Sequence, residues 1–93
     1  MNVVVRPYAE FRATLGEEEI TVSISSDASV RDVLRSLIAR SPQLANQIFE
    51  AEGSLSGHVN IFVNGVSVRG KWGLDTRLQD GDKIFLVSAF GGG

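Results

Sequence analysis

The sequence predicts an α+β fold in which one main helix packs across a mixed β-sheet, with the element order β-β-α-β-β-β. One segment, residues 30–38, repeats apolar residues at the period of a single helix face. Several other segments are β-branched or alternate between polar and apolar residues, as half-buried strands do. Because a lone amphipathic helix must bury its apolar face, a sheet covered by that helix follows from these observations.

Two strands are expected at the start of the chain. Val3-Val4-Val5 is a β-branched run, and Pro7 limits how far this strand extends. Residues 8–16 are of mixed character and predict no regular element. Residues 19–24 then alternate, which predicts a half-buried strand whose apolar members face inward. Two early strands with a short connection predict a hairpin.

The main helix has clear start and stop signals. Ser29 is a favourable N-cap residue, and Asp32 lies three positions later, where a capping box places its acid. The apolar face is built by Val30, Val33, Leu34, Leu37 and Ile38. Pro42 disfavours helical geometry in the residue before it, so the helix should end near Ser41.

The middle of the chain predicts a short helix and then a hairpin. Residues 43–50 are expected to form the helix, burying Leu44, Ile48 and Phe49. Residues 58–63 alternate and predict a strand. Asn64-Gly65 follows, a strong hairpin signal because both central residues of that turn adopt positive φ. Residues 66–68 are the expected return strand.

The last quarter of the chain predicts an irregular segment and a final strand. Residues 70–79 are expected to be irregular, with Trp72, Leu74 and Leu78 plugging the core. Asp80-Gly81-Asp82 predicts a turn, and residues 83–89 the last strand. Placed side by side at the centre of the sheet, the first and last strands would run parallel.

Length and composition predict a single small domain and exclude several function classes. The chain has 93 residues, a formal net charge of −2 and an isoelectric point near 5.2, without the basic field that nucleic-acid binding needs. It contains no cysteine, and no apolar run approaches the length of a membrane span. We therefore expect a cytoplasmic protein that binds neither nucleic acid nor membranes.

The sequence carries no pattern that indicates catalysis by this chain. His58 is the single histidine and has no cysteine or carboxylate cluster beside it in the sequence, so a strand-edge role is favoured over a metal ligand or a base. Glu17-Glu18-Glu19 is interpreted as an exposed acidic turn. No nucleophile–base pair, phosphate loop or dinucleotide fingerprint is present. We expect a non-catalytic protein without a metal site.

Three motifs lie in order toward the end of the sequence. They are Val63-Asn64-Gly65, Leu78-x-Asp80-Gly81-Asp82 and the final Gly92-Gly93. With this element order, the chain resembles the β-grasp (ubiquitin-like) fold and, more closely, the MoaD/ThiS family of sulfur carriers. The resemblance covers the whole chain and divides it into a β-grasp domain, residues 1–90, and a flexible C-terminal glycine tail, residues 91–93.

The tail departs from the family's usual ending, Pro-Pro-hydrophobic-small-Gly-Gly. Ser88-Ala89 stand at the proline positions, Phe90 at the hydrophobic position and Gly91 at the small one. Gly92-Gly93 is then the reactive pair. The missing prolines weaken an assignment to the bacterial type of molybdopterin synthase subunit and leave room for a divergent carrier or a protein modifier.

The resemblance implies chemistry at the carboxyl group of Gly93. A free carboxylate is a poor electrophile, and adenylation gives it a good leaving group. The implied partner is a ubiquitin-activating-type enzyme that uses ATP, while this chain binds no cofactor itself. Gly92 and Gly93 suit a narrow channel because they lack a Cβ atom. Attack by a sulfur donor then gives a thiocarboxylate.

Three functions stay open at this point. The leading one is a MoaD-like small subunit that carries sulfur for molybdopterin synthesis to a MoaE-like large subunit or another sulfur acceptor, since residues 42–57 resemble an insert of MoaD-like members. The second is a ubiquitin-like modifier joined through Gly93 to lysines of other proteins. The third is a non-covalent β-grasp binding module whose tail is inert.

Strand alternation predicts the face that meets these partners. If Ile61, Ile84 and Leu86 pack under the helix, the residues between them point to the other side of the sheet. Phe62, Phe85, Val87 and Val4 share that side, and Phe90 lies at the root of the tail. Exposed aromatic residues gathered on one face mark interaction sites. We expect these residues to dock the activating enzyme and the acceptor.

Overall fold

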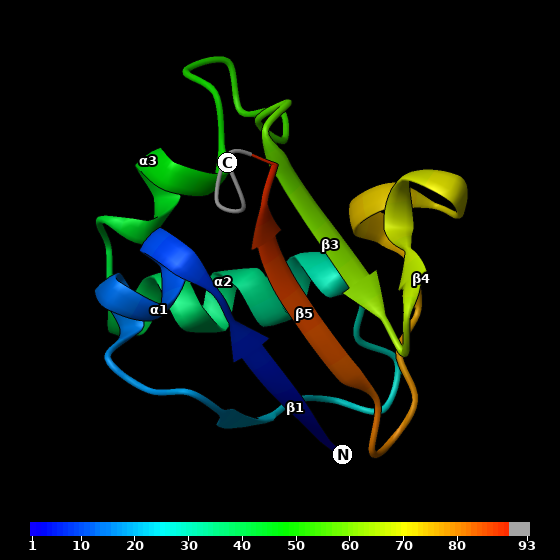
Figure 1. Ribbon diagram of the computed structural model, residues 1–93. Helices are drawn as coiled ribbons and strands as arrows, with labels where there is room; N and C mark the ends of the chain where they lie inside the picture. Colours follow the sequence, from blue (N-terminus) through cyan, green and yellow to red (C-terminus); the bar gives the residue numbers. More distant parts are fainter. Residues whose placement is uncertain (90–93) are drawn as a thin grey trace.

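The computed structural model describes residues 1–89 and has one mixed sheet with helices packed against it (Figure 1). The strands are β1 (Asn2–Pro7), β2 (Ile20–Ser23), β3 (Val59–Val63), β4 (Val66–Ser67) and β5 (Lys83–Ser88). They lie in the order β2-β1-β5-β3-β4. β1 and β5 are parallel, and the remaining neighbours are antiparallel. The predicted α+β fold and the parallel central pair are confirmed.

The helices share one hydrophobic core with the sheet. Within residues 1–89 they are α1 (Ala9–Leu15), α2 (Val30–Arg40) and α3 (Leu44–Ile48), with 3₁₀ turns η1 (Val68–Gly70) and η2 (Gly73–Asp75). Figure 1 shows α2 crossing behind the strands. Side chains that are 0% exposed come from both layers, among them Val5, Ile84 and Leu86 of the sheet and Val33, Leu34 and Leu37 of α2. The core therefore lies between α2 and the sheet.

α2 begins and ends where the sequence predicts. The backbone N–H of Ser29 donates a hydrogen bond of 2.8 Å to an Asp32 carboxylate oxygen, and the Ser29 hydroxyl donates to the same oxygen at 3.2 Å. At the other end, the Ser41 N–H donates to the Leu37 carbonyl at 2.9 Å, directly before Pro42. These contacts satisfy polar backbone groups that a helix end leaves without intrahelical partners.

The prediction that residues 8–16 form no regular element was wrong. The structure places α1 there, within the connection between the antiparallel strands β1 and β2. Phe11 is 0% exposed and anchors the helix in the core. Gly16 ends it in the left-handed region, with φ of 77°. Because so short a helix is marginal by itself, its packing through Phe11 stabilises it, and local periodicity could not reveal that.

The short third helix agrees with the prediction for residues 43–50. α3 spans the centre of that range, and its Leu44 and Ile48 are both 0% exposed. Phe49 directly follows and packs, partly buried, against the core. This segment therefore closes the core beside α1, where Gln47 accepts a hydrogen bond of 2.9 Å from the Thr14 hydroxyl.

The predicted hairpin between β3 and β4 forms, with a shorter return strand. Asn64 and Gly65 have φ of 51° and 87°, as the two-residue turn requires. The return strand was expected to reach Val68, but β4 ends at Ser67. Val68 begins η1 and is 0% exposed, so the chain turns inward at this point to bury it.

Trp72 does not plug the core, which corrects the prediction for residues 70–79. Its side chain is 78% exposed, whereas Leu78 is 4% exposed and Leu74 packs against the core. The physical reason is the local backbone: η1 and η2 are separated by a turn that carries Trp72 outward. Val68 and Leu78 are the apolar side chains that this part of the chain buries instead.

Candidate functional site at the end of strand β5

β5 is the central strand, and its end sets where the C-terminal segment leaves the domain. The Ala89 N–H donates a hydrogen bond of 2.6 Å to the His58 carbonyl, and the Tyr8 N–H donates one of 3.0 Å to the Leu86 carbonyl. The final described residues are therefore tied to chain segments on both sides. The predicted site residues Phe90, Gly91, Gly92 and Gly93 lie outside the described residues.

A serine, a histidine and a carboxylate gather beside this exit. Ser56 Oγ lies 2.7 Å from His58 Nδ1, and His58 Nε2 lies 3.8 Å from Glu10 Oε2. Such a set resembles a nucleophile with its base and orienting acid. Ser56, however, is only 5% exposed, so its hydroxyl is not presented to a substrate. The cluster instead fixes the segment that precedes β3. The interpretation of His58 as a strand-edge residue stays a prediction.

The side of the sheet away from α2, called here the outer face, carries the predicted partner residues. Val4, Phe62, Phe85 and Val87 are half-buried, while their neighbours along the strands are buried in the core. Phe62 and Phe85 are directly opposite each other on β3 and β5. The face assignment made from alternation agrees with the structure, and the role of this face as a partner interface stays a prediction.

Tyr8 extends the outer face, and no sequence pattern indicated its place there. Its ring stacks on Phe85 with the centroids 6.3 Å apart and the planes at 18°. The Arg12 guanidinium carbon lies 5.1 Å from the Tyr8 ring centroid, within cation–π distance. Arg6 follows on the rim and pairs with Glu19 at 3.0 Å. Tyr8 belonged to the segment predicted to be irregular, so its pairing with β5 was not visible.

Comparison with known proteins identifies the family. Residues 5–93 match the profile of the ThiS family. The chain belongs to the ThiS family. It is 38% identical over 93 residues to the small archaeal modifier protein 3 of Haloferax volcanii, with 100% of both chains covered. It is 33% identical over 95 residues to the sulfur carrier protein CysO of Mycobacterium tuberculosis, again with 100% of both covered.

Solved structures place this ThiS family chain among ubiquitin-like β-grasp proteins. SAMP1 of Haloferax volcanii superposes with a TM-score of 0.87 at 26% identity, covering 100% of both chains. The Amycolatopsis orientalis BexX/CysO complex gives 0.81 at 25%, covering 98% of this chain and 99% of that one. A candidate molybdopterin converting factor, subunit 1, of Pyrococcus furiosus gives 0.72 at 28%, covering 94% and 95%. The predicted β-grasp fold is confirmed.

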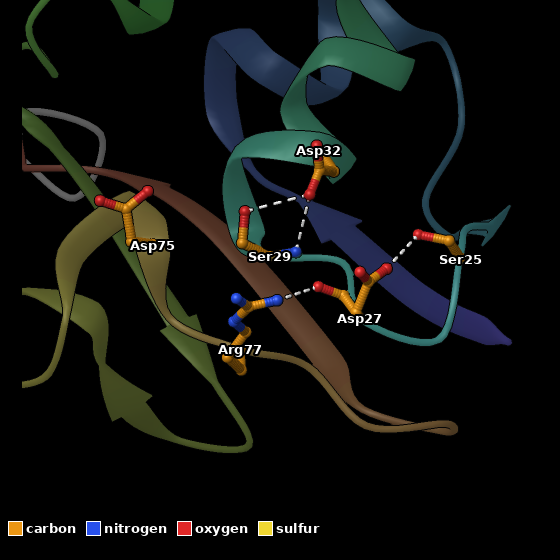
Figure 2. Close-up of a pocket in the computed structure, with 6 residues that line it drawn as sticks. All are labelled: Ser25, Asp27, Ser29, Asp32, Asp75 and Arg77. Atoms are coloured by element: carbon orange, nitrogen blue, oxygen red, sulfur yellow. Dashed lines mark hydrogen bonds between the residues drawn. The ribbon is translucent and has the colours of Figure 1, made fainter.

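A polar pocket of about 470 Å³ lies at the start of α2 in this ThiS family chain. It is lined by Ser25, Asp27, Ser29, Asp32, Asp75 and Arg77 (Figure 2). Arg77 donates to the Asp27 carbonyl oxygen, and Ser29 donates twice to Asp32. The two hydrogen bonds from Ser29 lower the pKa of the Asp32 carboxyl, and the bond from the backbone N–H has the larger effect. The polar groups thus fasten the segment after η2 to the start of α2.

Two further expectations concern metals and membranes. Within residues 1–89, no group of three or more histidine, aspartate or glutamate side chains is arranged to hold a metal ion. In the same part of the chain, no helix has both the length and the apolar character that crossing a bilayer requires. The candidate site of this ThiS family member consists of the outer face and the end of β5, where the C-terminal segment leaves the domain.

Proposed function

We propose that this protein is a carrier whose Gly93 carboxylate is adenylated by a ubiquitin-activating-type enzyme. The carboxylate attacks the α-phosphate of ATP, pyrophosphate leaves, and an acyl-adenylate forms. A hydrosulfide equivalent then attacks the carbonyl carbon, AMP leaves, and a thiocarboxylate remains. The observation that carries the proposal is the ThiS family match over residues 5–93, which includes the Gly92-Gly93 pair.

The scaffold suits this chemistry because the reacting carboxylate of Gly93 lies beyond the strands and helices that form the core. The Ala89 N–H is hydrogen-bonded to the His58 carbonyl at the end of β5, which anchors the chain to the sheet four residues before Gly93. Four fully extended residues span roughly 13 Å, at about 3.3 Å each. This length supports a reaction in which the carboxylate enters the active site of the partner while the domain stays outside. Catalysis then belongs to the partners. We expect the carrier to work in the cytoplasm, because the partners need ATP.

The outer face is the proposed docking surface for those partners. Phe62 and Phe85 lie opposite each other, Val4 and Val87 flank them, and Phe90 follows at the root of the tail. Aromatic residues in a half-buried apolar patch are the usual anchors of protein interfaces. The activating enzyme and the sulfur acceptor each need the tail, so both are expected to use this face in turn.

The most specific version of the proposal is that the carried sulfur is used for molybdopterin synthesis. A MoaE-like large subunit would then receive the sulfur. The fold similarity to the Pyrococcus furiosus candidate molybdopterin converting factor, at 28% identity, supports this form. The 33% identity to CysO supports a sulfur carrier for another acceptor equally well. Both forms require the same thiocarboxylate.

A second candidate function is protein modification. Its support is the 38% identity, over the full length of both chains, to a relative named small archaeal modifier protein 3. In this case the amine of a lysine attacks the Gly93 acyl-adenylate, AMP leaves, and an amide bond forms. The two functions share activation and diverge only in the nucleophile.

Intact-mass spectrometry of the protein isolated from its host separates the two fates. A carrier should show a mass gain equal to the replacement of one oxygen by sulfur. A modifier should show conjugates in which Gly93 is joined to lysines of other proteins. The matched control is the chain without Gly92-Gly93, which should show neither product. Finding only unmodified protein in the host, under conditions that demand sulfur transfer, would contradict both functions.

A further inference from the structure

A second surface of the molecule has the features of a binding site and lies outside the proposed function. Among residues 1–89, the exposed large hydrophobic side chains are Val66, at 49%, and Trp72, at 78%. They border a groove of about 450 Å³, here called the Trp72 groove. Its lining is Val63, Asn64, Val66, Val68, Lys71, Trp72, Thr76 and Arg77. Exposed apolar side chains gathered at a groove mark a candidate interaction site.

Positive charge also gathers around the groove, although the chain as a whole is acidic. Arg6, Arg31, Arg35 and Arg40 all form ion pairs with carboxylates. Arg69, Lys71 and Arg77, in the segment around the groove, have no carboxylate within ion-pair distance among the described residues. The whole chain carries a formal net charge of −2. The groove lining thus holds two cations, Lys71 and Arg77, and no carboxylate beside an exposed indole, which favours a ligand of opposite charge.

The basic side chains are held in place by backbone contacts. Arg69 Nη2 donates hydrogen bonds of 2.9 Å and 2.7 Å to the carbonyls of Ser56 and Val59. Arg77 donates to the Asp27 carbonyl oxygen. Carbonyl partners position a guanidinium without neutralising it. Arg69 therefore adds positive charge beside the groove, whereas Arg77 lies in its lining and also acts on the Asp32 carboxylate.

The Trp72 groove is separate from the outer face. It lies at the β4 edge, and β4 is two strands away from β5 in the sheet. Val63, which lines the groove, packs against the hydrophobic core, whereas Phe62 belongs to the outer face. Figure 1 shows η1, η2 and β4 on the side of the molecule away from β1. A ligand in the groove therefore leaves the outer face open.

We propose that the Trp72 groove binds an acidic segment of a partner protein that carries one large apolar side chain. The apolar side chain packs against Trp72 and Val66, and flanking carboxylates pair with Lys71 and Arg77. The valine lining and the modest number of cations favour a protein segment over single-stranded RNA, which needs a longer basic track. The inference goes beyond the proposed function, because it gives the carrier a means to select a partner while its tail is in use.

The test uses Trp72 itself as the reporter, since it is the single tryptophan of the chain. A displayed library of random linear peptides without tryptophan is selected against the full-length protein. Selected peptides are expected to contain aspartate or glutamate next to leucine, phenylalanine or methionine. Titrating such a peptide should shift the Trp72 emission to shorter wavelength and protect it from acrylamide quenching. Selected peptides that are basic, or that leave the emission unchanged, would overturn the proposal.

Matched variants locate the binding. Lys71→Glu should weaken binding of the labelled peptide about tenfold or more, since it replaces an attractive charge with a repulsive one. Lys83→Glu makes the same charge change outside the groove lining and should change binding less than twofold, within roughly 0.4 kcal/mol. Trp72→Ala should remove most of the binding, and its fold is safe because the side chain is exposed. Equal affinity of Lys71→Glu and Lys83→Glu would contradict the proposed charge pairing.

Two further measurements complete the test. Single-stranded poly(U) should not shift the Trp72 emission at physiological salt, and a shift with poly(U) alone would overturn the protein-segment proposal in favour of RNA. Trp72→Ala should leave adenylation of Gly93 unchanged. Loss of peptide binding with intact adenylation is therefore distinguishable from a failure of the carrier function.

Discussion

The two faces of the sheet differ although they are built by alternate residues of the same strands. On β5, Ile84 and Leu86 are 0% exposed and face α2, while Phe85 and Val87 are half-buried on the outer face. The inner side chains contribute stability because they lose all contact with water. The outer ones keep solvent contact and are free to meet another protein. Strand alternation thus gives one element two separable roles.

The largest expected effect is on stability and comes from the inner face. Leu86→Ala removes a fully buried side chain and should lower the free energy of unfolding by about 2–5 kcal/mol. Urea unfolding followed by circular dichroism measures it. The adjacent Val87→Ala, on the outer face, is the control and should cost clearly less. Equal losses for the two variants would contradict the division of roles between the faces.

The next effect concerns recognition and comes from the outer face. Phe85→Ala removes a ring that stacks on Tyr8 and lies opposite Phe62. As an interface anchor it should weaken binding to the adenylating partner about tenfold or more, with only about 1 kcal/mol lost from folding stability. Calorimetric titration of the cognate enzyme measures the affinity. Val66→Ala, at the Trp72 groove, should leave this affinity unchanged, and a reversed pattern would assign docking to the other surface.

The smallest effect is pH-dependent and belongs to the start of α2. The Ser29 hydrogen bonds lower the pKa of Asp32 in the folded state. A lowered pKa contributes stability that is present above the unfolded-state pKa of about 4 and is lost as pH falls through the folded-state value. Asp32→Asn should therefore be less stable than the wild type at pH 7.

Unfolding midpoints measured from pH 7 down to pH 2 test the sign of this effect. The gap between Asp32→Asn and the wild type should shrink below about pH 4, where the carboxylate becomes protonated first in the unfolded state and, at lower pH, in the folded state. Asp80→Asn is not a suitable control, because Asp80 accepts a hydrogen bond from the Asn2 backbone. Glu18→Gln is better, since Glu18 is exposed and has no side-chain hydrogen bond or ion pair among residues 1–89, so its gap should stay small at every pH. A gap that widens on acidification would contradict the assigned role.

Features set by local sequence were predictable, and features set by distant contacts were not. The apolar period of α2, its Ser29 and Asp32 cap and the Asn64-Gly65 turn are local, and each appears as expected. α1 depends on burying Phe11 under elements far away in the sequence. Trp72 was misplaced because the turn between η1 and η2 carries it outward, while Val68 and Leu78 are buried. Hydrophobicity alone does not say which apolar residue is left outside.

The same distinction holds for the candidate site. Alternation in β3 and β5 was enough to place Phe62 and Phe85 on one face. The stacking of Tyr8 on Phe85 required the parallel pairing of β1 with β5. The lining of the Trp72 groove lies within residues 63–77, but the short 3₁₀ turns η1 and η2 that bring these residues together follow no apolar period in the sequence. The stacking is a product of the sheet topology, and the groove is a product of these two turns.

The central claim is that the folded domain exists to present the Gly93 carboxylate for activation. ATP–pyrophosphate exchange, measured with the adenylating enzyme of the same host, tests it directly. The full-length protein should support exchange. The protein without Gly92-Gly93 should not support exchange, although it should unfold at the same urea concentration as the full-length protein. Exchange with the truncated protein, or none with the full-length protein and every adenylating enzyme of that host, would contradict the claim.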